Sequence, residues 1–152
     1  MALTKEQVLT DLQSVHDEFL RQAEATGWLA PQNGGTWQVR DVAAHIAAWD
    51  RLLIADIGDV LKGSVPPWSA WDDALTDIVN DMQVRAYTSF SLEQLHAEVT
   101  VARQKLIATV RALDDEQFTK GVAAVDGAEY SPRSLCEYFV AHDRSHIEEL
   151  SA

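Results

Sequence analysis

Four long stretches of the sequence carry apolar residues at every third or fourth position. This spacing places the apolar side chains on one face of an α-helix, and such a face leaves water only by packing against other helices. Each stretch also has sequence signals of a helix start or end. We therefore expect long amphipathic helices over residues 4–25, 38–62, 91–113 and 131–150.

The helix ends are predicted by particular residues. Thr4 to Gln7 and Ser91 to Gln94 are capping boxes, in which a hydroxyl and a glutamine each bond the backbone amide of the other residue. Ser131 followed by Pro132 indicates the start of the last helix, because serine accepts an amide hydrogen and proline has none to lose. Gly63 is typical of the residue that ends a helix. The registers of these helices are thus well defined.

The connecting segments are less regular. Residues 71–87 predict a fifth helix with a less regular apolar stripe, and the preceding segment from Ser69 to Asp72 resembles an N-cap. Residues 27–35 are interpreted as a loop, residues 114–117 as one helical turn, and residues 119–130 as a loop or short hairpin. The predicted fold is an all-α, antiparallel four-helix bundle that forms a single domain over residues 1–152, with a short extra helical turn and a loop before the last helix.

Charge and cysteine content restrict the class of protein. The formal net charge is −12, and an acidic surface repels phosphate backbones and anionic lipids. The single cysteine excludes an intrachain disulfide, and the sequence has neither an apolar export segment nor a run long enough to span a membrane. We expect a cytoplasmic protein, monomeric or homodimeric, with a small-molecule substrate and without a nucleic-acid or membrane partner.

Two histidines on the last helix indicate a metal site. His142 and His146 are four residues apart and continue the apolar stripe of Leu135 and Phe139, so both imidazoles are expected to point inward. Such a pair can bind one metal ion together with a third ligand. His45, at the border of the apolar face of the second helix, is the candidate for that ligand. The alternative is that these are buried neutral histidines bonded to carbonyl or carboxylate groups.

Other residues near these histidines have two interpretations each. Asp41, Asp143 and Glu149 are candidate catalytic acids that orient imidazoles or move protons, or else they are solvated helix residues. Trp37 and Trp49 either form the wall of a substrate pocket or pack in the core.

Three further residues are considered as site residues. His16 is expected at the edge of the first helix's apolar face or in solvent, because it has no partner histidine three or four residues away. His96 is either a fourth ligand or outer-shell residue, or simply a helix residue beside Leu95. Cys136 is either a half-buried structural thiol or a nucleophile near a helix start.

Two segments resemble a known family. The string from Trp37 to Trp49 and the string from His142 to Leu150 are similar to the DinB-like (damage-inducible, YfiT-type) four-helix-bundle superfamily, and the middle of the chain resembles its ClbS/DfsB branch. The resemblance implies that His45, His142 and His146 bind a divalent metal such as zinc, nickel or iron. It also implies a low-molecular-weight thiol as co-substrate in some members.

The leading functional hypothesis combines these observations. It is a metal-dependent enzyme that acts on small electrophilic molecules in stress or detoxification, as a thiol-dependent transferase or isomerase or as a hydrolase. Two alternatives remain open. One is a non-catalytic protein that binds or sequesters a small molecule, and the other is a structural dimer with a vestigial metal site.

Overall fold

The computed structural model describes residues 2–151, with the side chains of Asn33 and Ser151 excepted. The predicted all-α fold is confirmed. Four long helices form the bundle, and each begins and ends within two residues of the predicted bounds. They are α1 (Lys5–Thr26), α2 (Val39–Leu61), α4 (Leu92–Arg111) and α6 (Pro132–Ser151).

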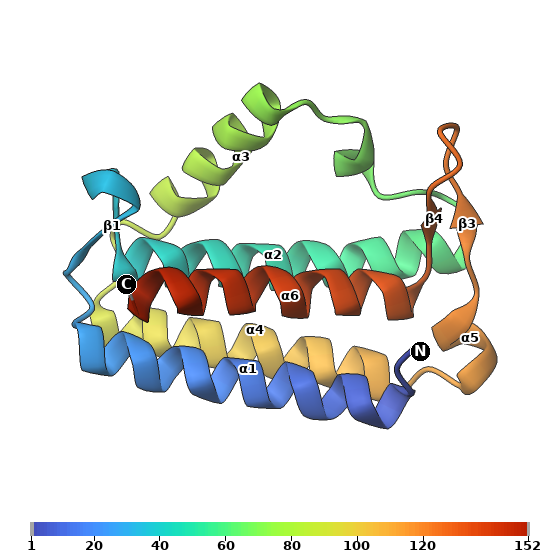
Figure 1. The fold of residues 1–152 in the computed structure, drawn as a ribbon, viewed down its shortest axis with the longest axis horizontal. Helices are drawn as coiled ribbons and strands as arrows, with labels where there is room; N and C mark the ends of the chain where they lie inside the picture. Colours follow the sequence, from blue (N-terminus) through green and yellow to red (C-terminus); the bar gives the residue numbers. More distant parts are fainter. Residues whose placement is uncertain (1, 152) are drawn as a thin grey trace.

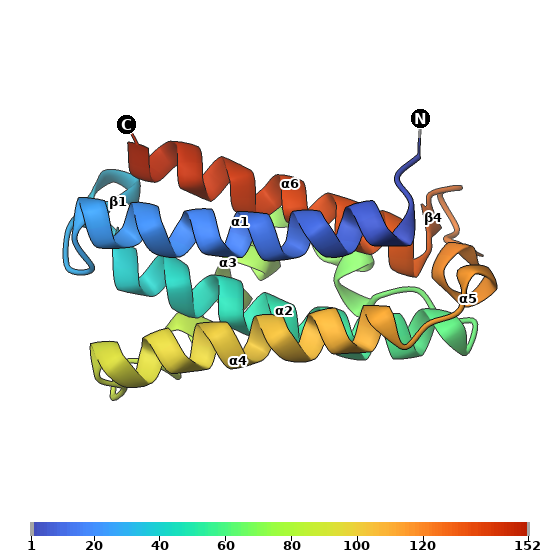
Figure 2. The ribbon, with the colours of Figure 1, turned by 90° about the horizontal axis from the view of Figure 1, so that it is seen from below.

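The helices do not follow a simple up-and-down order. Helix α1 contacts α4 and α6, and α2 contacts the same two helices from the other side (Figure 2). As Figure 1 shows, α1 and α6 run in one direction while α2 and α4 run in the other. Each helix therefore has one parallel and one antiparallel neighbour. The parallel pairing of α2 with α4 is possible because residues 62–91 lead the chain back to the end where α2 began.

This return segment contains α3 (Asp73–Arg85), which crosses over the side of α2 and α6 that faces away from α1 and α4 (Figure 1). The helix was predicted over residues 71–87, and an N-cap at Ser69 is wrong. Ser69 lies in the short 3-10 helix η2 (Pro67–Ala70), and the N-cap is Asp72, whose carboxylate accepts the amide of Leu75 at 2.8 Å. Asp is as good a cap as Ser, so sequence alone did not separate the two.

Short antiparallel strand pairs join the helices at both ends of the bundle. One pair lies before α2, where a loop was predicted. It consists of β1 (Pro31–Gln32) and β2 (Trp37–Gln38), which are joined by the 3-10 turn η1 (Asn33–Gly35). In this pair Gln32 lies opposite Trp37. The helical turn predicted before α6 is present as α5 (Asp115–Thr119). Of the loop or short hairpin predicted after it, the hairpin is observed, with β3 (Val122–Ala123) paired to β4 (Glu129–Tyr130). None of the described helices is long and apolar enough to cross a membrane.

A buried arginine connects the helices at the middle of the core. Arg103 of α4 is 1% exposed. Its guanidinium donates two hydrogen bonds to Asp50 of α2, at 2.8 and 2.9 Å, and one to Asp143 of α6 at 2.6 Å. A further hydrogen bond, to the carbonyl oxygen of Leu12 in α1, is 2.9 Å long. One side chain thus links all four helices of the bundle.

The Arg103 network predicts a large effect of mutation on stability. Arg103→Met fills much of the same volume but leaves the carboxylates of Asp50 and Asp143 buried without their cation, which costs about 3–5 kcal/mol. Urea unfolding followed by circular dichroism measures the loss. The control is Arg51→Met, which breaks the exposed ion pair with Glu98 and should cost less than about 1 kcal/mol. Equal losses for the two variants would contradict the central role of Arg103.

His16 also lies in the core, so the prediction that it sits at the edge or in solvent is wrong. It is 4% exposed on α1. Burial, followed by the nearby charge of Arg103, lowers the pKa of His16 to about 4. The inward turn of His16 follows from its position next to Val15 and four residues after Leu12, both of which are buried.

The shifted pKa of His16 predicts how stability depends on pH. The unfolded chain binds a proton at His16 below about pH 6.5, whereas the folded chain binds it only near pH 4. His16 alone should therefore lower the stability by up to about 3 kcal/mol as the pH falls from 6.5 to 4. His16→Gln should reduce this decrease in metal-free protein, measured by urea unfolding at several pH values. The exposed His96→Gln variant should keep the wild-type slope, and a wild-type slope in His16→Gln would contradict the assignment.

Candidate metal centre

Three imidazoles from α2 and α6 meet at one point. His142 Nε2 lies 3.1 Å from His45 Nε2 and 3.2 Å from His146 Nε2. One ligand atom from each of the three residues lies within 4.8 Å of the others. Nitrogen ligands about 2.0–2.1 Å from one tetrahedral ion are about 3.3–3.4 Å apart. The three histidines can therefore hold a single metal ion.

Two of these imidazoles contact a carboxylate through Nδ1, the ring nitrogen that does not take part in the convergence. His142 Nδ1 lies 3.2 Å from Asp143 Oδ1, and His146 Nδ1 lies 3.3 Å from Glu149 Oε2. An ionised carboxylate only accepts hydrogen bonds, so each Nδ1 carries the proton and each Nε2 presents a lone pair. Two lone pairs that face each other at 3.2 Å repel, and a metal ion bound by both nitrogens, or a proton on one of them, removes that repulsion. This arrangement fits a metal better than the alternative of neutral histidines bonded to separate carbonyl or carboxylate groups.

His45 completes the group from a more buried position. It is 3% exposed, and its Nδ1 has no hydrogen-bond partner among the described residues. Burial and the neighbouring His142 and His146 lower the pKa of His45 to about 3. Burial and His142 also lower the pKa of His146. Both rings are thus kept neutral near pH 7, which is the state that binds a metal.

The residue of this part of α6 that points into the core is Asp143. The prediction that His142 and His146 continue the inward stripe is therefore corrected. Asp143 is 4% exposed, whereas His142 and His146 are only partly buried and lie to one side of the core. Burial opposes the charge on Asp143, but the Arg103 guanidinium and the hydrogen bond from His142 outweigh it and lower the pKa of this carboxyl. Asp143 therefore remains charged and connects the Arg103 network to the candidate metal centre.

Asp41 has a different position from the other two candidate acids. Its Oδ2 accepts the backbone amide of Gln38 at 2.8 Å, at the start of α2. Among the described residues it makes no hydrogen bond to an imidazole. Asp41 acts on the site only by fixing the first turn of α2, one turn before His45.

Both tryptophans lie near His45, with ring centres 5.2 and 6.4 Å from its own, and both donate hydrogen bonds to α3. The Trp37 ring centre is 5.2 Å from that of His45, and its Nε1 donates to Asp81 at 3.3 Å. Trp49 is buried against Phe139, and its Nε1 donates to Asn80 at 2.9 Å. Each tryptophan thus combines packing with the formation of a cavity wall.

Two cavities flank the imidazoles beneath α3. The larger has a volume of about 470 Å³, and the smaller, about 370 Å³, shares His45, His142 and Asn80 with it. Their volumes are in the range of small-molecule sites. The larger one is lined by Gln32, Thr36, Trp37, Val42, His45, Asp77, Asn80, Asp81, His142, Ser145, His146 and Glu149.

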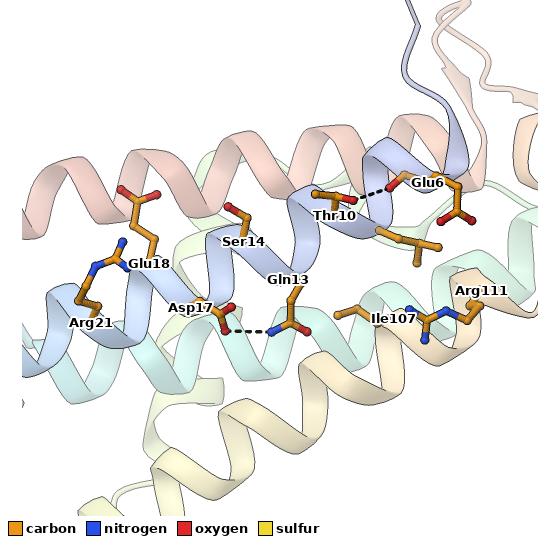
Figure 3. Close-up of a pocket in the computed structure, with 10 residues that line it drawn as sticks. Glu6, Thr10, Gln13, Ser14, Asp17, Glu18, Arg21, Ile107 and Arg111 are labelled. Carbon is orange, nitrogen blue, oxygen red and sulfur yellow. Dashed lines mark hydrogen bonds between the residues drawn. The ribbon is translucent and has the colours of Figure 1, made fainter.

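A cavity of about 580 Å³ on the opposite side of the bundle is not part of this site. It lies along α1 and α4 and contains no histidine among its described residues (Figure 3). Its polar groups bond one another along α1, as Gln13 does with Asp17 at 2.9 Å. We interpret it as a surface groove between two helices.

The structure separates two other candidates from the site. His96 is exposed, lies beside Trp28 and is not among the converging histidines, so its proposed role as a fourth ligand has no geometric support. Cys136 is fully buried, and burial raises the pKa of its thiol to about 12. A buried protonated thiol favours the structural interpretation over a nucleophile, although the thiol is fully buried and not half-buried as predicted.

Sequence reasoning missed the residues that support the site. Arg103 follows Val99 and precedes Leu106 on the inward face of α4, and a charged residue in that position is a signal that could have been noticed. Asp50, between Trp49 and Leu53 in α2, is another. Asn80 gave no such signal, because its role depends on how α3 lies over the bundle.

Comparisons with known proteins agree with this architecture. YfiT from Bacillus subtilis, described as a probable metal-dependent hydrolase with an unusual four-helix bundle topology, superposes with a TM-score of 0.71 at 19% identity, over 97% of this chain and 83% of YfiT. An uncharacterised protein from Escherichia coli UTI89 gives a TM-score of 0.74 at 14% identity, over 97% of this chain and 91% of that one. No curated protein matches the chain significantly.

These likenesses establish the fold, and the sequence establishes the family. The sequence model of the DinB superfamily matches residues 9–150, which is nearly the whole chain. The matched region contains all three converging histidines and the Arg103 network. The chain therefore belongs to the DinB superfamily.

Proposed function

We propose that this protein is a divalent-metal-dependent enzyme that acts on small electrophilic molecules, with His45, His142 and His146 as the metal ligands. The observation that carries the proposal is the convergence of three Nε2 atoms, two of them on rings whose Nδ1 faces a carboxylate. Zinc, nickel and iron all suit imidazole ligands. Three protein ligands leave a position open for a substrate or nucleophile, and a bound divalent ion supplies Lewis acidity there.

The protein residues around this position have distinct proposed roles. Asp143 is buried and bonded to both His142 and Arg103, so it orients the imidazole and has no free oxygen for proton transfer. Glu149 lines the cavity, contacts His146 and has a side chain that is 64% exposed. We therefore assign proton acceptance from the attacking nucleophile to Glu149.

The nucleophile in this proposal is water or a low-molecular-weight thiol. The description of YfiT as a probable metal-dependent hydrolase supports water. A cavity of about 470 Å³ beside the imidazoles also has room for a thiol together with a small electrophile. Trp37 and Val42 provide apolar surface in that cavity for the body of the substrate.

Metal binding by the three histidines is testable through stability. Zinc or nickel at 100 times the dissociation constant should stabilise metal-free, tag-free protein by about 2.7 kcal/mol, because the metal binds only the folded site. Thermal unfolding measures the gain. His142→Ala and His146→Ala should each lose it, whereas His96→Ala should retain it. A gain that persists without His142 would place the metal elsewhere.

Catalysis is tested separately from binding. Metal-loaded protein should hydrolyse p-nitrophenyl acetate, or conjugate 1-chloro-2,4-dinitrobenzene with a thiol, faster than His142→Ala does. At saturating metal, Glu149→Gln should lower kcat by about 100-fold, the usual size of a general-base effect, and its metal affinity should fall by about 10- to 100-fold because Glu149 also fixes the Nδ1 proton of His146. Glu148→Gln, an exposed neighbour, is the matched control. Metal-loaded protein that turns over neither probe would contradict the catalytic proposal and favour a binding protein.

A further inference from the structure

Helix α3 turns its polar side toward the bundle and its apolar side toward solvent. Leu75, Ile78 and Met82 share one face and are 41%, 57% and 63% exposed. The opposite face carries polar residues that line the two cavities beside the imidazoles. These are Asp73, Thr76, Asp77, Asn80 and Asp81. An amphipathic helix on a protein surface normally has the reverse orientation.

Polar contacts hold α3 in this orientation. Val84 is its one buried apolar residue within the described chain. The indole hydrogen bonds of Trp49 with Asn80 and of Trp37 with Asp81 instead connect its polar face to the bundle. The three exposed apolar side chains gain no hydrophobic stabilisation from the bundle, and the polar face instead contacts the indole N–H groups and lines the cavities beneath the helix.

The inward face is negatively charged where it meets the candidate metal centre. Asp77 and Asp81 of α3 and Glu149 of α6 line the larger cavity. The described residues of both cavities include no lysine or arginine. Asp77 and Asp81 are themselves exposed, and the same cavity also contains the buried His45, so the acids border the candidate metal centre.

We propose that the substrate of this site carries a cationic nitrogen group, such as a primary ammonium or a guanidinium, which the α3 carboxylates bind. The inference rests on the proposed metal-dependent function. The reacting atom lies at the point where the three Nε2 atoms converge, and the cationic group lies toward Asp77 and Asp81. Like charges disfavour an anionic substrate in the same cavity, so these two residues determine specificity by attraction and by repulsion.

The test uses three thiols that differ in charge as probes of zinc-loaded protein. Cysteamine is cationic, 2-mercaptoethanol is neutral and mercaptoacetate is anionic, and each presents a sulfur ligand for the metal. Isothermal titration gives a dissociation constant for each thiol. Since the thiols differ in acidity, the relevant quantity is how each constant changes between the wild type and the Asp77→Asn/Asp81→Asn variant.

The variant should bind cysteamine about 10-fold more weakly and mercaptoacetate more tightly, because two charges near the ligand are lost. Binding of 2-mercaptoethanol should not change. Asp17→Asn/Glu18→Gln on the outer face of α1 alters the net charge equally and should leave all three constants at their wild-type values. Zinc-dependent thermal stabilisation confirms that each variant is folded and loaded.

The possible failures are distinguishable. Wild-type protein that does not bind zinc would overturn the proposed function, and with it this inference. Protein that binds zinc and all three thiols with constants unaffected by Asp77→Asn/Asp81→Asn would overturn the charge specificity alone. Equal changes in the α1 control variant would show that net charge, and not the face of α3, determines the preference.

Discussion

The buried ion pairs of Arg103 are the interaction on which the rest of this structure depends. A guanidinium that is 1% exposed is tolerable only with its charge and its hydrogen-bond donors satisfied, and Asp50, Asp143 and the carbonyl of Leu12 satisfy them. These partners come from three other helices, so they restrict how the helices can shift relative to one another. Apolar side chains alone would permit more such shifts, because hydrophobic contacts have no direction.

The same network places the candidate metal centre. One carboxylate oxygen of Asp143 accepts a hydrogen bond from Arg103, and the other lies 3.2 Å from His142 Nδ1. The orientation of His142 therefore depends on the interaction that aligns α4 with α2 and α6. His45 lies on α2, between Asp41, which caps the first turn, and Asp50, which binds Arg103. The positions of two of the three imidazoles thus follow from the polar core of the bundle.

The helices and the three histidines could be predicted from the sequence because their signals are local. Caps at Thr4, Ser91 and Ser131 and the apolar spacing define helices to within two residues. The order of helix contacts could not be predicted, because it depends on where α3 leads the chain. The burial of Asp143 was missed because an apolar stripe omits polar residues whose partners are distant in sequence, as Arg103 is for Asp143. The burial of His16 was missed because the stripe was drawn through apolar residues alone.

Helix α3 shows most clearly where the periodicity of apolar residues misleads. The positions of Leu75, Ile78 and Met82 predict a face that packs against the bundle, yet these residues are exposed. The rule that apolar faces turn inward assumes that the neighbouring surface is apolar as well. Beneath α3 lie imidazoles, indole N–H groups and a cavity, and this surface is better matched by Asn80 and Asp81. The orientation of α3 therefore follows the hydrogen-bond donors beneath it, since the buried indole N–H of Trp49 would cost free energy without the acceptor that Asn80 provides.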